Sequence, residues 1–171
     1  LLTDNLADLV DQWKVGGSYR AIFLSLPVDE AIRNIYLGIT TLVSAELPTE
    51  RMDVALSNAD QEDEHSCFSD NTHRDIRLNL EGVINVYQGQ YNSINGPSLE
   101  DLVKQVSMTA YNDTNASMIS AYEKTEATQT PFDLAISGGL ASTEGAKVRA
   151  AVLQLQDFGA QLRHGLGKIG R

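Results

Sequence analysis

Apolar residues return every three or four positions along most of this chain, which is the spacing of one face of an α-helix. Residues 2–14 show this spacing from the start, and a pair of glycines ends the segment. A second stripe predicts a helix over about 27–47, which Pro48 should break. A third stripe predicts a helix that ends near Gly89, with its apolar face formed by Ile76, Leu80, Val83 and Tyr87.

The second half of the chain continues the helical pattern between short polar connections. Residues 90–97 are rich in Asn, Ser, Gly and Pro and predict a loop, after which Ser98 caps a short helix over 99–106. A helix over 108–128 is expected to bury the side formed by Met108, Tyr111, Asn115, Met118, Ile119 and Tyr122. A last long helix opens near Thr143, and its stripe comprises Val148, Ala151, Val152, Leu155, Phe158 and Leu162.

These elements predict the fold class. No stretch of useful length alternates between apolar and polar residues, so no substantial β-sheet is expected. The pattern favours an all-α fold, an up-and-down helical bundle of about four long helices with short helices packed on it. Gly38 and Gly82 lie inside predicted helices and are expected to allow close helix contact. We assign residues 1–171 to one helical-bundle domain, with residues 1–26 as a helical lead-in.

Composition excludes some classes of partner. The chain has 13 Lys and Arg against 23 Asp and Glu, which gives a net charge of −10. Nucleic acids and anionic membrane surfaces attract clustered basic residues, so neither is expected as a partner. No apolar run reaches the roughly 18 residues of a transmembrane segment. The single cysteine, Cys67, cannot form an intrachain disulfide.

The pattern that bears most on function lies just before the third apolar stripe. If that helix extends upstream from Ile76, the same face continues through Thr72, Ser69, His65 and Glu62. The face then becomes polar where the core should be, and buried polar groups need partners. Further polar residues are expected close to it, on adjoining faces or at the inward end of the preceding long helix: Asp70, His73, Asp75 and Glu46.

Two interpretations of this polar face remain open. Imidazole and carboxylate groups suit zinc or iron, so the face is a candidate metal-cation site. The alternative is a hydrogen-bonded network that holds the end of the helix. No HExxH pair and no EF-hand loop occurs in the chain. Cys67 is a weaker candidate nucleophile, because a lone cysteine is more often a small buried apolar residue. The acidic run 60–64 is typical of a solvated helix start.

Several segments resemble a known family. They occur in one order along the chain: LADLVDQW at 6–13, YRAIFLSLP at 19–27, ELPTERMDVAL at 46–56, EDEHSCFSDNTHRDI at 62–76, GVINVYQGQY at 82–91 and GPSLEDLV at 96–103. Together they resemble the C-terminal half of imelysin-like proteins. The resemblance implies one half of a fold with two helical bundles. It also implies a bacterial protein of the periplasm or outer membrane, iron-regulated and involved in iron uptake.

The resemblance also implies a site shared between two halves. The family signature GxHxxE belongs to the N-terminal half, and no HxxE occurs here, since Phe68, Ile76 and Gly167 follow the three histidines at that spacing. The partner is then the N-terminal half of the same protein, removed by design or proteolysis, or present as a separate cleaved chain. The 62–75 segment would be the contribution of this half, and residues 1–26 a lead-in from the other.

Three functions follow as hypotheses. The leading one is binding of iron, zinc or another metal cation at a site between two helical bundles. Its metal ligands would be Glu62, His65, Asp70 and Glu46, in a pocket lined by Ser69, Thr72, His73 and Asp75. A zinc-dependent metallopeptidase of the insulin-cleaving type is the second hypothesis, since one branch of the family is classified so. The third is an envelope module that binds a ligand other than metal, or a partner protein.

Overall fold

The computed structural model describes residues 1–169 and consists mainly of helices. It divides into two compact units, Leu1–Ile35 and a second unit that begins at Tyr36. The boundary lies within one helix, α3 (Val28–Thr41). No helix in residues 1–169 is long and apolar enough to cross a membrane.

The first unit is a small helical segment held by aromatic contacts. Its helices are α1 (Leu2–Trp13), close to the predicted 2–14, and α2 (Ser18–Leu24). The Trp13 ring packs on Tyr19 and Phe23, with centroid distances of 4.9 and 5.5 Å. The apolar stripe of α1 is exposed, so this unit has little core of its own.

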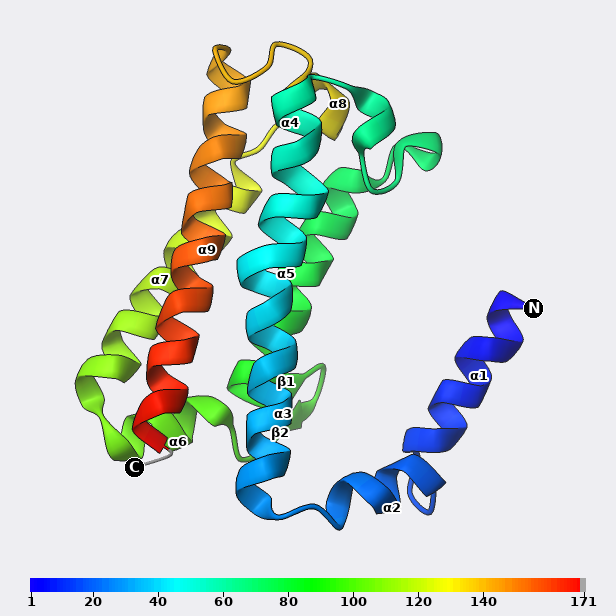
Figure 1. The fold of residues 1–171 in the computed structure, drawn as a ribbon, viewed down its shortest axis with the longest axis vertical. Coiled ribbons are helices and arrows are strands. Elements are labelled where there is room, and N and C mark those ends of the chain that lie inside the picture. Colours follow the sequence, from blue (N-terminus) through cyan, green and yellow to red (C-terminus); the bar gives the residue numbers. More distant parts are fainter. Residues whose placement is uncertain (170–171) are drawn as a thin grey trace. The chain divides into compact units, whose positions relative to one another are not determined.

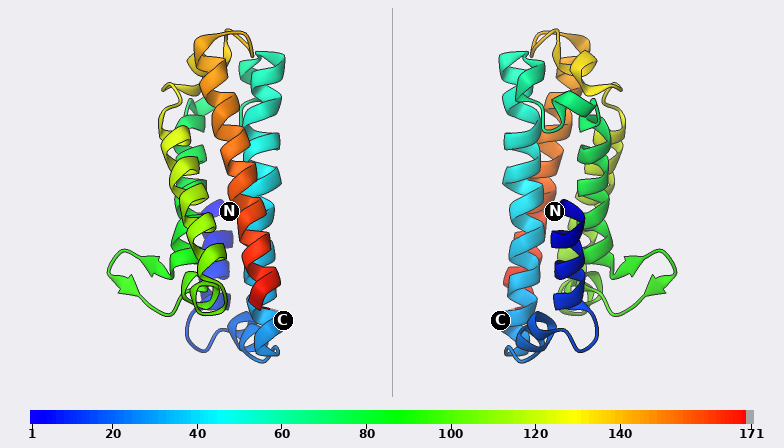
Figure 2. Two further views of the ribbon diagram at one scale, coloured as in Figure 1. Left: turned by 90° about the vertical axis from the view of Figure 1, so that its left-hand side faces the viewer. Right: turned by 90° about the vertical axis from the view of Figure 1, so that its right-hand side faces the viewer.

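The second unit is a bundle of four long helical segments (Figures 1 and 2). Helix α9 packs along α7 and along η1 (Leu42–Asp53), the segment that continues α3. Helix α5 packs on α7 and on η1. These contacts confirm the predicted all-α bundle. The bounds are α5 (Thr72–Gln88), α7 (Met108–Glu126) and α9 (Thr143–Ile169).

The first long helical segment of the bundle continues past Pro48, the residue that was expected to end it. After α3 the chain continues as a π-helical segment, η1 (Leu42–Asp53), and then as α4 (Val54–Asn58). Pro48 lies buried inside η1. In an α-helix, proline loses a hydrogen bond to residue i−4 and its ring clashes with that carbonyl. The wider π turns use bonds to residue i−5, so the predicted break at Pro48 is wrong.

Short elements connect the long ones. The predicted loop at 90–97 contains a two-residue hairpin, and Asn92 turns it with a left-handed backbone (φ 52°). Figure 2 shows this hairpin projecting from the bundle. Ser98 caps the next helix as predicted, since its hydroxyl accepts the Asp101 N–H at 3.0 Å. The bounds are η2 (Gln61–Asp63), η3 (Cys67–Ser69), β1 (Gln90–Tyr91), β2 (Ile94–Asn95), α6 (Leu99–Val106) and α8 (Phe132–Ile136).

The core confirms two predicted stripes and corrects a third. All the apolar positions predicted for α5 and α9 are buried. In α7 the prediction is largely wrong, because Met108, Ile119 and Tyr122 are exposed. Apart from Met118, the buried face of α7 consists of small residues: Ala110, Thr114, Ser117, Ala121 and Thr125. Small side chains let α9 come close, so the packing follows size rather than hydrophobicity.

Candidate functional site

The candidate site lies where the chain passes from α4 to α5. Helix α5 begins at Thr72, so its predicted extension back to Glu62 is wrong. Left-handed residues at Ala59 and Asp70, both with φ 52°, bracket the segment between the helices. Within it, the Asp60 carboxylate accepts the Glu62 N–H at 2.9 Å and starts a separate short turn. The helical register therefore does not hold upstream of α5.

The change of register exchanges exposed and buried positions. Glu62, His65, Ser69 and Asp70 are exposed, and of the four positions on the predicted inward face only Thr72 is buried. The carboxylate that turns inward is Glu64, with 5% of its surface exposed. Sequence reasoning missed Glu64 because it falls in an acidic run that was expected to be solvated. No periodicity signals it, because the segment is not helical.

Glu64 is a buried carboxylate that forms no hydrogen bond of good geometry, although the Thr72 hydroxyl lies near enough to act on its pKa as a hydrogen-bonding group. Neither of its oxygens has a partner among the described residues. Burial raises the pKa of Glu64, and the negative charges of Asp133 and Asp70 raise it further, while the nearby Thr72 hydroxyl lowers it. Glu64 is therefore a buried carboxyl group whose surroundings favour its protonated form.

A second polar group ties this segment to the first turns of α5. The Ser66 hydroxyl donates to Asp75, and the His65 Nδ1 lies 3.4 Å from the same carboxylate oxygen. The Ser66 N–H also donates to the Thr72 hydroxyl at 3.1 Å. A Ser–His–Asp triad needs the histidine between the serine and the acid. Here the carboxylate stands between them, so this arrangement holds the segment in place and does not activate a nucleophile.

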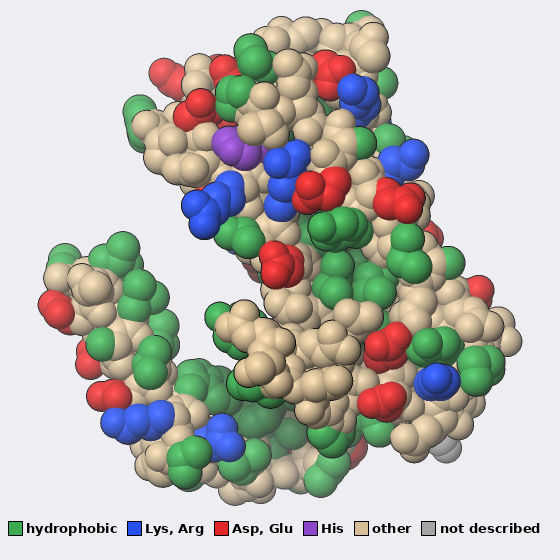
Figure 3. All heavy atoms as spheres, turned by 180° about the vertical axis from the view of Figure 1, so that it is seen from behind, with side chains coloured by type: hydrophobic (Ala, Val, Ile, Leu, Met, Phe, Trp, Pro, Cys, Tyr) green, Lys and Arg blue, Asp and Glu red, His purple; other side chains and the backbone are tan. Residues whose placement is uncertain are grey.

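Other predicted residues have separate surroundings. Glu46 pairs with Arg51 at 3.6 Å rather than with the 62–75 segment. His73 is half-buried, and its Nδ1 is buried without a partner among the described residues. Cys67 is a half-buried free thiol. Figure 3 shows acidic and basic side chains, with a histidine among them, gathered on the second unit near the start of α5.

Arg77 of α5 holds the connection between α7 and α8. Its guanidinium donates to the Glu126 and Thr128 carbonyls at 3.3 and 3.2 Å and to the Thr130 hydroxyl at 3.2 Å. It also pairs with the Glu126 carboxylate at 3.4 Å. This connection leads directly into α8, which carries Asp133. Arg77 therefore fixes the segment that leads into α8.

Comparison with known proteins places the chain in a family. The family model for peptidase M75, described as imelysin, matches residues 1–162. The chain belongs to the imelysin family. The match extends beyond the segments quoted above and includes most of α9. No curated protein matches the chain.

The candidate site around Glu64 in this imelysin-family chain offers mainly oxygen donors. Within residues 1–169, no group of three or more His, Cys, Asp or Glu side chains is placed to hold a metal ion. Carboxylate and hydroxyl oxygens suit hard cations, whereas zinc sites favour nitrogen and sulfur. The groups that act on the pKa of Glu64 are Thr72, Asp133 and Asp70, which carry only oxygen donors.

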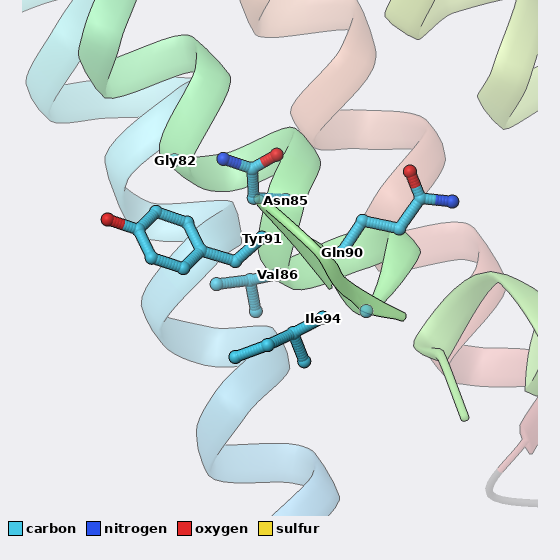
Figure 4. Close-up of a pocket in the computed structure, with 7 residues that line it drawn as sticks. Gly82, Asn85, Val86, Gln90, Tyr91 and Ile94 are labelled. Carbon is cyan, nitrogen blue, oxygen red and sulfur yellow. The ribbon is translucent and has the colours of Figure 1, made fainter. Parts of the chain in front are cut away.

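The imelysin-family chain also has an uncharged groove away from this site. One hollow of about 350 Å³ lies between α5 and the hairpin, and another of about 210 Å³ lies between α5 and α3. The two share Gly82 and Val86 in their linings. Figure 4 shows the Tyr91 ring beside Val86, with Ile94 below them and Gln90 directed elsewhere.

The groove corrects the expectation for two glycines. A Cβ at Gly38 or Gly82 would meet no atom within 4 Å, so neither glycine allows a close helix contact. Both instead line the open hollow between α3 and α5.

Proposed function

We propose that this imelysin-family chain binds a metal cation, with a role in bacterial iron uptake in the cell envelope. The observation that carries the proposal is the buried Glu64 carboxylate, whose two oxygens have no partner among the described residues. A buried polar group left unsatisfied costs about 1–3 kcal/mol, and more when it is charged. A cation at Glu64 would supply the missing interaction. The iron-uptake role itself rests on the family resemblance.

The proposed ligands differ in part from those predicted by the helical pattern. Glu64 replaces Glu62, which is exposed, and Glu46 is paired with Arg51. Asp70 stays a candidate ligand as an exposed carboxylate in the same segment. His65 is held by Asp75 and would orient the segment rather than bind the cation.

The proposed site is open to further ligands. Hard cations such as calcium take 6–8 oxygen ligands, and magnesium keeps several waters. Few such groups surround Glu64, so water and a partner must complete the shell. We infer that the partner is the N-terminal half of an imelysin-type protein, as a covalent neighbour or a separate chain. This inference follows from the two-bundle architecture that the resemblance implies.

Calorimetric titration tests the proposal. Ferric citrate, Mn²⁺ and Zn²⁺ would be titrated into this chain and into a protein that carries both halves. Glu64→Gln should weaken binding of the hard cations, because it removes the charge and one acceptor oxygen. Glu62→Gln is the matched control, since Glu62 is an exposed carboxylate in the same segment. Equal binding by the two variants, or no binding by the two-half protein, would overturn the proposal.

A second candidate function is supported by the groove at Gly82. Its lining has no Asp, Glu, Lys, Arg or His in a chain of net charge −10, and it includes the exposed side chains of Val86, Tyr91 and Ile94. Such a surface suits an uncharged ligand or an apolar partner surface. Gly82→Leu would fill the hollow. Loss of ligand or partner binding in this variant, with cation binding intact, would favour the second candidate.

A further inference from the structure

The hairpin that follows α5 presents a tyrosine ring beside the hollow at Gly82. Tyr91 and Ile94 are paired directly across the two strands, so their side chains lie on the same face of the hairpin. Both side chains are exposed, and both line the hollow. The hairpin is closed at its base, where the Gly96 N–H donates to the Gly89 carbonyl at 3.1 Å. The Tyr91 ring is therefore carried by a closed hairpin rather than by an open loop.

Helix α5 forms the other side of the hollow and contributes a polar group to it. Asn85 lines the hollow, and its amide donates no hydrogen bond to any side chain or carbonyl among the described residues. In the view of Figure 4 this amide lies above the Tyr91 ring. A Cβ at Gly82 would meet no atom within 4 Å, so a ligand can come close to the helix backbone there. An aromatic ring, a free amide and bare helix backbone thus border one space.

The chemistry of this lining selects a class of ligand. It has no Asp, Glu, Lys, Arg or His, so a charged ligand would lose hydration without gaining a charged partner. An acyl chain or an apolar helix would cover the Asn85 amide and leave it unpaired, which costs free energy. The volume of about 350 Å³ lies at the lower end of ligand pockets, which span about 300–1,000 Å³. A small neutral ring with an apolar face and a polar edge satisfies all three conditions.

We propose that the hollow binds a neutral saccharide, with one pyranose ring stacked on Tyr91 and a hydroxyl hydrogen-bonded to Asn85. The inference rests on the second candidate function proposed above and names its ligand class, and it does not depend on a cation at Glu64. The C–H groups of the sugar face would cover the tyrosine ring. Hydroxyls at the sugar edge can both donate to an amide and accept from it. Binding would then cover exposed apolar surface and leave no polar group unpaired.

Titration with methyl β-D-glucopyranoside, followed by the amide chemical shifts of the labelled chain in EDTA, tests the stacking. This probe is neutral, and its hydroxyls lie around the ring edge, so its faces are free to stack. Tyr91→Ala should weaken binding about tenfold, because the ring supplies much of the apolar area that the sugar covers. Tyr91→Phe keeps the ring face and should bind like the unaltered protein. Tyr122→Ala, which removes an exposed tyrosine of α7, is the matched control and should leave binding unchanged.

The same titration tests the amide and the ligand class. Asn85→Ala should weaken binding about two- to tenfold, the effect of losing one hydrogen bond. Glucuronate should bind more weakly than the glucoside, and tighter binding of glucuronate would overturn the inference. An unchanged affinity of Tyr91→Ala for the glucoside would also overturn it. If 1-octanol shifts the residues of the hollow and the glucoside does not, the saccharide is excluded while the second candidate function stands. If neither probe shifts them, both fail.

Discussion

Glu64 loses its hydration on folding, and no described side chain replaces it. Burial penalises the charged form of a carboxyl group, so its pKa in the folded protein rises above the ordinary value of 4.5. The folded state then holds this proton more tightly than the unfolded state does. Folding stability should fall as pH rises from about the unfolded pKa through the raised folded pKa.

Glu64→Gln should remove this loss of stability, because glutamine keeps the shape and does not ionise. We expect the variant to match the unaltered protein at pH well below 4.5, where Glu64 is protonated in both states. Above the folded pKa the variant should be the more stable one. Urea unfolding in EDTA across this pH range measures the difference. Glu62→Gln should follow the unaltered protein, and equal pH profiles for the two variants would contradict the prediction.

Substitution by alanine is expected to have opposite effects on stability at Gly82 and at Gly159. Gly82→Ala should stabilise by about 1 kcal/mol, because alanine is the better helix former and its Cβ meets open space. Gly159→Ala should destabilise by about 1–3 kcal/mol, because its Cβ would lie 2.5 Å from the Ser44 Cβ. Urea unfolding of both variants measures the two effects. A stabilised Gly159→Ala protein would show that η1 can move away from α9.

At the scale of single residues, the sequence predicts the role of those residues that depend only on near neighbours in the chain. Ser98 was found as a cap because capping depends on the next three residues. Thr72 was correctly expected to face inward, since it lies in the first turn of α5. The burial of Glu64 was not predicted, because Glu64 lies in a non-helical segment where hydrophobic periodicity gives no signal.

At the scale of elements, the long helices differ in how much their sequences reveal. The stripes of α5 and α9 contain large apolar residues at regular spacing, and burial follows that spacing. In α7 the larger residues Met108 and Tyr122 are exposed, while small polar residues face α9. A hydrophobic stripe therefore misleads where two helices approach closely, because the packing partner decides which side fits.

Arg77 links α5 to the connection between α7 and α8, and its loss should loosen that connection. Arg77→Met keeps much of the aliphatic stem and removes three hydrogen bonds to residues 126–130. We expect a loss of about 1–3 kcal/mol of unfolding free energy, with faster amide exchange in α8. Arg74→Met is the control, since Arg74 is an exposed arginine of the same helix. Equal exchange in α8 for both variants would show that the clamp is not needed.

At the scale of the molecule, composition and hydrophobic periodicity predicted the all-α bundle. They did not predict that its first long helical segment continues past Pro48. The bundle class follows from amphipathic helices that can bury their apolar faces only against one another. Continuity through Pro48 needed π turns over Leu42–Asp53, which depend on how the segment packs against α9. The same limit applies to the hollow at Gly82, since a glycine in a helix predicts close packing as readily as open space.

The distribution of the core predicts that the second unit folds without the first two helices. Every buried large hydrophobic residue of the described chain lies at Tyr36 or beyond. A chain that begins at Pro27 would keep α3 whole and lose mainly exposed side chains. Its unfolding free energy should stay within about 1 kcal/mol of the full chain, because exposed positions contribute little. Circular dichroism should show cooperative urea unfolding with the same midpoint, and a broad, non-cooperative transition would show that residues 1–26 contribute to the core.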